Sequence, residues 1–215
     1  VMRAGLSLQK VDSQTGKTPQ GDASLEGIKF QIVNANSQAV VVDGVAYGPG
    51  KTVGAPLSTN AQGIASTPAD YLPLGTYEVR ESDTNTSMLI TADSQTITLE
   101  QNRMYTVVPL VSPMSNEVVR GGIRMGKVSR ETNEHLTQGE ATLEGAVFSI
   151  TLKAGNPVVV RGSTFGVGEE VLTVTTNEDG IAQTEVRDLP YGTYEIREQT
   201  PPKGFLLNEE WSKEI

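Results

Sequence analysis

The chain has 215 residues, a formal net charge of -9 at pH 7, no cysteine and 5% aromatic residues. An acidic chain without a basic run is a poor candidate for binding nucleic acid, and no apolar stretch reaches membrane-spanning length. The lack of cysteine excludes disulfides, thiolate catalysis and cysteine-based zinc sites. We therefore expect small β domains with many turns, since the chain holds 22 glycines and 11 prolines.

Short segments with alternating or β-branched residues predict strands along the whole chain, and no window has a helical period over three turns. In the first half these segments are LSLQKVD (6–12), IKFQIVN (28–34), TYEVRES (76–82), QTITLE (95–100) and a last candidate within 104–119. Turn signals such as SQTG and NAQG separate them. Short strands at this spacing predict an all-β fold of the sandwich type.

The sequence repeats itself at an offset of 117 to 118 residues. LEGIKFQI at Leu25 matches LEGAVFSI at Leu143, and LPLGTYEVRE at Leu72 matches LPYGTYEIRE at Leu189. The two glycines of NEVVRGG (116–122) mark the boundary, so we expect domains at 1–118 and 119–215. The second copy ends before a counterpart of the first copy's last strand, and no signal peptide is visible at Val1. We expect the sequence to come from within a longer protein.

Each copy places one lysine and one glutamate in phase with its apolar residues. Lys10 shares a face with Leu6 and Leu8, and Glu81 shares a face with Tyr77 and Val79. In the second copy, Lys127 and Glu198 hold the matching positions. The alternation of side chains along the strands, taken alone, favours a buried ion pair between the lysine and the glutamate, or a lysine whose amine reaches the solvent. A buried charge pair is, however, not reliably stabilising.

Other motifs predict turns or solvated loops instead of a cofactor or metal site. GPGKT (48–52) resembles part of a phosphate-binding loop, but Val45 replaces the required first glycine, and the second copy has Glu169 and Glu170 in place of the Lys–Thr pair. His135 is the only histidine and lies in a polar stretch, so the common triad and zinc schemes lack their residues. We expect no cofactor, no metal and no enzymatic activity.

KVDSQTGK, LEGIKFQI and the G-x-Y-x-x-x-E box together resemble the Cna B-type (SpaA-like, prealbumin-like) domains of Gram-positive surface adhesins and pilins. The second copy's LPYGTYEIREQTPPKGF matches that box closely, with one extra proline, and the resemblance covers nearly the whole chain. The first copy instead continues as ESDTNTSM, and Ser129 stands where the first copy has Asp12. The resemblance implies two tandem Ig-like or prealbumin-like β-sandwich domains, the second lacking its last strand in this chain.

The resemblance also implies a covalent bond between the side chains of a first-strand lysine and a last-strand asparagine or aspartate. Carried over, Lys10 is the nucleophile, Asn116 the acceptor and Glu81 the acid that promotes the reaction. Lys127 and Glu198 match the lysine and the acid of the second domain, whose acceptor does not occur in this chain. Burial disfavours both charged forms, and a neutral amine can attack an amide carbon, so the implied chemistry is coherent.

Two functions are compatible with this sequence. The first is a structural stalk module of a pilin or adhesin, stabilised by isopeptide bonds, with neighbouring repeats as partners and an extracellular, cell-wall-anchored location implied by the resemblance. The alternative is an adhesive module that binds a host glycan or matrix protein through its long inserts at 40–63 and 158–180. These inserts are similar in both copies, which favours a shared structural hairpin over a specialised site.

Overall fold

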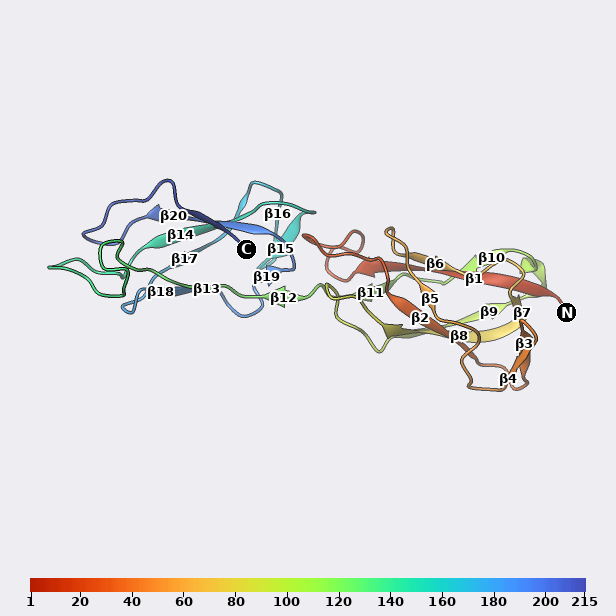
Figure 1. Cartoon of the computed structure of the whole chain (residues 1–215). Helices are drawn as coiled ribbons and strands as arrows, with labels where there is room; N and C mark the ends of the chain where they lie inside the picture. Colours follow the sequence, from red (N-terminus) through yellow and green to blue (C-terminus); the bar gives the residue numbers. More distant parts are fainter. The chain divides into compact units, whose positions relative to one another are not determined.

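The computed structural model describes residues 1–215, and its regular secondary structure consists almost entirely of strands (Figure 1). Its residues divide into two compact units. Unit 1 comprises Val1–Pro19 and Ser24–Val118, and unit 2 comprises Gln20–Ala23 and Val119–Ile215. The change of unit at 118/119 coincides with the sequence boundary, whereas the assignment of Gln20–Ala23 to unit 2 has no signal in the sequence. None of its helical segments is long and apolar enough to cross a membrane.

Unit 1 contains eleven strands and one 3₁₀ turn, η1 (Gln101–Arg103). The strands are β1 (Arg3–Asp12), β2 (Lys29–Asn34), β3 (Val40–Val42), β4 (Val45–Tyr47), β5 (Leu57–Ser58), β6 (Ile64–Ser66), β7 (Leu72–Pro73), β8 (Gly75–Asp83), β9 (Ser94–Leu99), β10 (Val107–Pro109) and β11 (Met114–Asn116).

Two sheets form the sandwich of unit 1. In the first sheet β1 pairs in parallel with β10 and then β11 along one edge, and antiparallel with β6 and β7 along the other. The second sheet has the order β5-β2-β8-β9. Alternate residues of these strands fill the core, among them Leu6, Ile32 and Val79, each at most 1% exposed. Burial of such apolar side chains is the main favourable contribution to folding.

The last strand candidate of the first copy is interrupted. The continuous run at 104–119 folds as two short strands, β10 and β11, which pair with successive parts of β1. Pro109 and Pro113 explain the break, because proline has no backbone N–H to donate to a sheet. The interruption leaves β11 free to align with the end of β1, where Lys10 lies.

Unit 2 follows the same plan with fewer strands. Its strands are β12 (Arg120–Gly121), β13 (Arg124–Gly126), β14 (Val147–Leu152), β15 (Val158–Val160), β16 (Ser163–Phe165), β17 (Glu170–Thr175), β18 (Ile181–Gln183), β19 (Leu189–Pro190), β20 (Tyr194–Thr200) and β21 (Ser212–Glu214). The order β17-β14-β20-β21 corresponds to β5-β2-β8-β9. β13 pairs with β18 alone, so no strand of this chain takes the place that β10 and β11 hold beside β1.

The long inserts of the two copies begin with the same hairpin. β3 pairs with β4 and β15 pairs with β16, each across a two-residue turn. Asp43 and Gly44 have φ of 49° and 79°, and Arg161 and Gly162 have φ of 49° and 85°. Two successive positive φ angles are typical of the tight turn that suits the twist of a hairpin. The hairpin is therefore a shared structural element.

Candidate functional site

Lys10, Glu81 and Asn116 meet in the core of unit 1. The Lys10 Nζ lies 2.9 Å from the Glu81 Oε2 and 2.6 Å from the Asn116 Oδ1. The Asn116 Nδ2 donates a hydrogen bond of 2.7 Å to the Glu81 Oε1. Each of the three side chains thus contacts both others, which makes a closed triangle of polar groups.

Strand register explains how residues so far apart in the sequence converge. β1 and β11 are parallel neighbours, with the Cα of Lys10 opposite Met114 and that of Asp12 opposite Asn116. Lys10 and Asn116 are therefore diagonal neighbours on the inner face of one sheet, within reach of a long side chain. Glu81 approaches from β8 in the facing sheet. The sandwich itself assembles the triangle.

The triangle is sealed from water. Lys10 and Asn116 are 0% exposed, and the side chain of Glu81 is fully buried although its residue as a whole is 8% exposed. Phe30 of β2 covers part of the triangle, since the Lys10 Nζ lies 5.6 Å from the centre of the Phe30 ring. Electrostatic interactions inside such a site are stronger than in water.

Phe30 reaches this position because of a bulge. The β2–β8 register shifts between Lys29 and Phe30, which places Phe30 directly opposite Glu81. Unit 2 repeats the feature, with a shift between Val147 and Phe148 that sets Phe148 opposite Glu198. Bulges often re-aim a side chain next to a site. Phe30 is a site residue that was not predicted from the sequence, although the phenylalanine repeated in LEGIKFQI and LEGAVFSI was an available signal.

The loop that follows β8 also covers the triangle, which the sequence did not predict. Thr91 places its hydroxyl 3.4 Å from the Glu81 Oε2. Met88 is 2% exposed and forms an isolated bridge with Val118, close to Asn116 in the chain. The segment ESDTNTSM (81–88) leads from the end of β8 into this loop, and it stands in place of the proline-containing segment of the second copy. The loop therefore acts as a local cover for the site of unit 1.

Burial lowers the pKa of the Lys10 amine below its ordinary value of 10.5, and this desolvation outweighs the hydrogen bond and the charge of Glu81, which act in the opposite direction. Desolvation disfavours the ammonium form, because a buried cation loses its hydration. The unprotonated amine is the nucleophilic form of lysine. The site thus combines a lysine amine with a lowered pKa, a side-chain amide that is hydrogen-bonded to it, and a carboxyl group that is hydrogen-bonded to both.

Asp12 has a structural role at the end of β1. Its Oδ1 accepts a hydrogen bond of 2.8 Å from the Gln14 backbone N–H, and its carbonyl accepts one of 2.8 Å from Gly16. In unit 2 the Ser129 carbonyl accepts the equivalent backbone bond from Asn133, also at 2.8 Å. The turn is therefore preserved where serine replaces aspartate.

Unit 2 brings together only two of these groups. The Lys127 Nζ lies 2.8 Å from the Glu198 Oε1, and their side chains are 17% and 2% exposed. Lys127 is more exposed than Lys10, as expected where no strand corresponding to β11 lies beside β13. The lysine and acid predicted from the sequence thus pair in both units, whereas an asparagine joins them only in unit 1.

A profile of the SpaA prealbumin-like fold domain matches residues 4–111 and again residues 122–215. The chain belongs to this family. The two matches agree with the repeat in the sequence and with the common strand order of the two SpaA-type units. A comparison with curated proteins found no match.

Solved structures similar to these SpaA-type units include proteins from several bacteria. The Bacillus anthracis TIE protein matches with 22% identity and a TM-score of 0.57, over 100% of this chain and 31% of that one. A Streptococcal ancillary pilin matches with 25% identity and a TM-score of 0.40, over 100% and 59%. The shaft pilin SpaA from Lactobacillus rhamnosus GG matches with 17% identity and a TM-score of 0.37, over 99% and 92%. The chain thus spans less than two thirds of the first two proteins.

Proposed function

We propose that this chain is a structural module of a Gram-positive pilin or surface adhesin, and that unit 1 is stapled by an isopeptide bond between Lys10 and Asn116. The observation that carries the proposal is the buried triangle, in which the Lys10 Nζ touches the Asn116 side chain at 2.6 Å and Glu81 contacts both. Membership of the SpaA prealbumin-like family supports the structural role.

The reaction needs only the three side chains. The neutral Lys10 amine attacks the Asn116 Cγ, and a tetrahedral intermediate forms. Glu81 transfers the proton that the lysine nitrogen loses to the Asn116 Nδ2, the Cγ–Nδ2 bond breaks, and one ammonia leaves. The product is a secondary amide between Nζ and Cγ. Folding holds the reactants together, and such preorganisation corresponds to effective molarities of roughly 10⁵ M or more.

The bond would compensate for the absence of disulfides. It joins residues that are 106 positions apart in the sequence. By analogy with a disulfide, closing a loop of this length removes unfolded-state entropy that corresponds to about 5 kcal/mol. Because Lys10 lies on the first strand and Asn116 on the last strand of unit 1, a pulling force would pass through the bond and spare most of the unit. Resistance to tension suits a stalk.

The protein modifies itself once and turns over no substrate, so it is not an enzyme in this proposal. Its location is outside a Gram-positive cell, attached to the cell wall as part of a longer surface protein. Its partners are neighbouring repeats of the same surface protein. Unit 2 contributes the Lys127–Glu198 pair, and within this chain that pair stays unlinked because no asparagine lies beside it.

Intact mass under denaturing conditions tests the proposal. The wild-type chain should be lighter than its sequence mass by one ammonia, and Glu81→Ala should restore the full mass because proton transfer is lost. Glu198→Ala is the matched control, since it removes the equivalent acid of unit 2 and should retain the deficit. A full sequence mass for the wild type would reduce Glu81 to a buried ion-pair partner of Lys10.

A further inference from the structure

Unit 2 includes Gln20–Ala23, a segment that reads PQGDA with the preceding proline. Gln20 is 1% exposed, and its Oε1 accepts hydrogen bonds from the Val159 backbone N–H at 2.7 Å and from the Arg120 Nη2 at 3.4 Å. Buried polar side chains in proteins are normally hydrogen-bonded, and these bonds show that unit 2 has a specific site for the Gln20 side chain. This recess of unit 2, lined by Arg120 and Val159, is called the glutamine site below.

The backbone after Gln20 completes the attachment. Gly21 and Asn156 exchange two backbone hydrogen bonds, of 3.2 Å and 2.8 Å. The Asp22 N–H donates to the Tyr191 carbonyl at 3.1 Å, and the Asp22 Oδ2 accepts from the Thr193 hydroxyl at 2.8 Å. The segment is thus held along its length by main-chain bonds, which recognise a backbone shape, and by two side chains, which recognise its sequence.

Unit 1 carries the counterpart of the glutamine site. Arg3 corresponds to Arg120, and Val41 corresponds to Val159, at the offsets of the repeat. The Arg3 guanidinium donates to the carbonyls of Tyr71 and Val41, just as the Arg120 guanidinium donates to the carbonyls of the two equivalent residues. The arginine that shapes the site is therefore held in the same way in both units.

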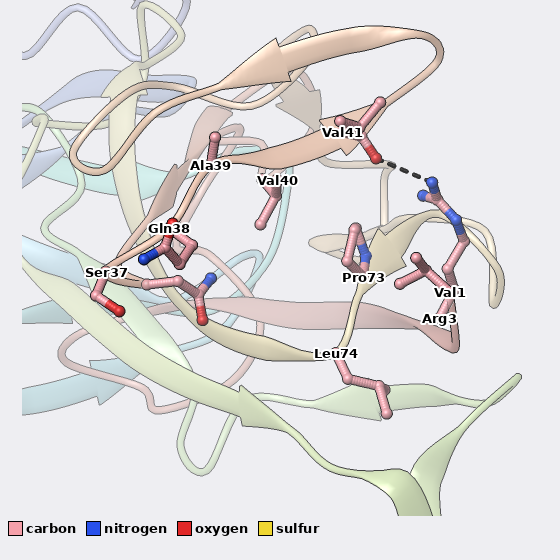
Figure 2. A pocket seen from close by; sticks show the side chains of 10 residues that line it. Val1, Arg3, Ser37, Gln38, Ala39, Val40, Val41, Pro73 and Leu74 are labelled. Atoms are coloured by element: carbon pink, nitrogen blue, oxygen red, sulfur yellow. Dashed lines mark hydrogen bonds between the residues drawn. The ribbon is translucent and has the colours of Figure 1, made fainter.

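In unit 1 this place is a cavity of about 410 Å³ (Figure 2). Figure 2 shows the Arg3 guanidinium at its edge, bonded to the Val41 carbonyl, with Gln38 and Leu74 among the lining residues. Gln38 corresponds to Asn156 and Leu74 to Tyr191, the two residues that bind the backbone of Gln20–Ala23 in unit 2. Gln38 is exposed, and Val41 is 48% exposed.

The second copy of the repeat displays the matching segment on the surface. TQGEA at 137–141 corresponds to PQGDA at 19–23, and Gln138, Gly139 and Glu140 are all exposed. The two turns have the same shape. Gly139 has a φ of 59° and Gly21 a φ of 56°. The Ala141 N–H donates to the Gln138 carbonyl at 3.1 Å, the same bond that closes the turn after Gln20.

We propose that the loop at 137–141 of one chain binds the Arg3–Val41 cavity in unit 1 of a second copy, in the way that Gln20–Ala23 is bound in unit 2. Gln138 accepts hydrogen bonds from the Val41 N–H and Arg3, Gly139 pairs with the backbone of Gln38, and the Glu140 N–H donates to the Leu74 carbonyl. The inference does not depend on the isopeptide bond.

The loop and the cavity lie on different units, so the contact is head-to-tail. A heterologous contact of this kind extends into an open chain of copies unless its rotation happens to close a ring. One short loop buries little surface, so we expect weak binding between free chains. The same contact gains a high effective concentration when the two partners are consecutive repeats of one polypeptide.

Glycine at position 139 provides a sharp test. A Cβ on Gly21 would come within 2.2 Å of the Tyr191 carbonyl oxygen in the bound segment of unit 2, whereas a Cβ on Gly168 meets nothing within 4 Å. Both Gly139 and Gly168 have positive φ, 59° and 87°, so alanine strains each loop in a comparable way. Gly139→Ala should therefore block docking, and Gly168→Ala is the matched control.

The experiment titrates unlabelled chain into ¹⁵N-labelled Gly139→Ala chain, which keeps its cavity but cannot donate its loop. Unlabelled wild type and Gly168→Ala should shift the amide signals of Gln38 and Val41 in proportion to concentration, while unlabelled Gly139→Ala should leave them in place. The absence of shifts up to the solubility limit would overturn the proposal. So would equal shifts with the Gly139→Ala partner.

The position of Ser37 gives a second, independent readout. Its counterpart Gly155 leaves room for the bound segment, because a Cβ there would lie 2.4 Å from the Gly21 carbonyl oxygen. In unit 1, Ser37 has a side chain at the position where unit 2 has Gly155. Ser37→Gly in the labelled chain should therefore strengthen binding of the 137–141 loop severalfold. Weaker or unchanged binding in this variant would contradict the equivalence of the two sites.

Discussion

Lys10 and Asn116 are 106 residues apart in the chain, yet the Lys10 Nζ lies 2.6 Å from the Asn116 Oδ1 on two adjacent parallel strands. Glu81 touches both residues from the opposite sheet. In the proposed reaction these residues are the nucleophile, the acceptor and the proton carrier, and the fold holds all three in contact.

Loss of the proposed bond should destabilise unit 1 alone. In Glu81→Gln the loop closed by the bond opens, which removes about 5 kcal/mol of stabilisation and lowers the Tm of unit 1 by roughly 20 °C. Calorimetry of the whole chain measures the transition of each unit. Glu198→Gln is the control, because it removes a buried ion pair without removing a bond. Equal losses of stability in the two variants would show that no cross-link contributes.

Phe30 should be needed for fast bond formation as well as for packing. Phe30→Ala opens the Lys10 site to water and removes a buried ring, at a cost of about 3–5 kcal/mol. Hydration restores the ammonium form, so the freshly purified variant should contain chains of full sequence mass. Phe148→Ala removes the equivalent ring of unit 2, and its chains should all retain the deficit of one ammonia. If all chains of Phe30→Ala were lighter by one ammonia, Phe30 would contribute to packing alone and not to bond formation.

The stability of unit 1 should fall in alkaline solution because of Tyr77. Burial raises the pKa of Tyr77 to about 12, although Arg3 acts in the opposite direction. A raised folded-state pKa adds stability that is complete below pH 10, the ordinary pKa, and is lost as the pH rises through about 12. Two pH units correspond to about 3 kcal/mol at most.

Urea unfolding of the Glu81→Gln chain between pH 8 and 12 measures this dependence. Tyr77→Phe should flatten the decline and lower the stability at pH 8 by about 1 kcal/mol, because the bond from the Tyr77 hydroxyl to the Pro73 carbonyl is lost. Tyr105 is 61% exposed, so Tyr105→Phe should leave the slope as it is. A slope that Tyr77→Phe does not change would assign the alkaline loss to another group.

Single-molecule stretching should find unit 1 almost inextensible. With the bond in place, the residues between Lys10 and Asn116 carry no tension, so the wild type should lack a step from their unfolding. Glu81→Gln should show an added step of roughly 350 Å, the extended length of about 106 residues. Steps of this size in the wild type would contradict a bond that closes the unit.

Alternation along the strands was enough to predict that Lys10 and Glu81 face the core, because side chains on a strand repeat every two residues. It could not supply Asn116, whose role came from a family resemblance, since no local pattern reports which strand lies beside β1. Phe30 was missed for a related reason. The position of Phe30 opposite Glu81 depends on a one-residue shift in register between β2 and β8. Such a shift arises from the pairing of the two strands and cannot be recognised in the sequence of one strand.

The repeats and most strands of the fold could be predicted from the sequence, whereas several of its tertiary contacts could not. Residues 104–119 were expected to hold one strand, and the two prolines that divide it were the signal against that expectation. The burial of Gln20 in unit 2 had no signal at all, because QGD is equally typical of a solvated turn. The turn of the same shape at Gln138 is exposed.

The most direct test of the central claim is peptide mapping of the wild-type chain by tandem mass spectrometry after complete digestion. If the bond has formed, digestion yields one branched peptide in which the segment with Lys10 is joined to the segment with Asn116, with a mass one ammonia below the sum of the two segments. Glu81→Ala should yield the two segments separately. Two linear peptides from the wild type, with Lys10 and Asn116 unmodified, would contradict the proposed bond.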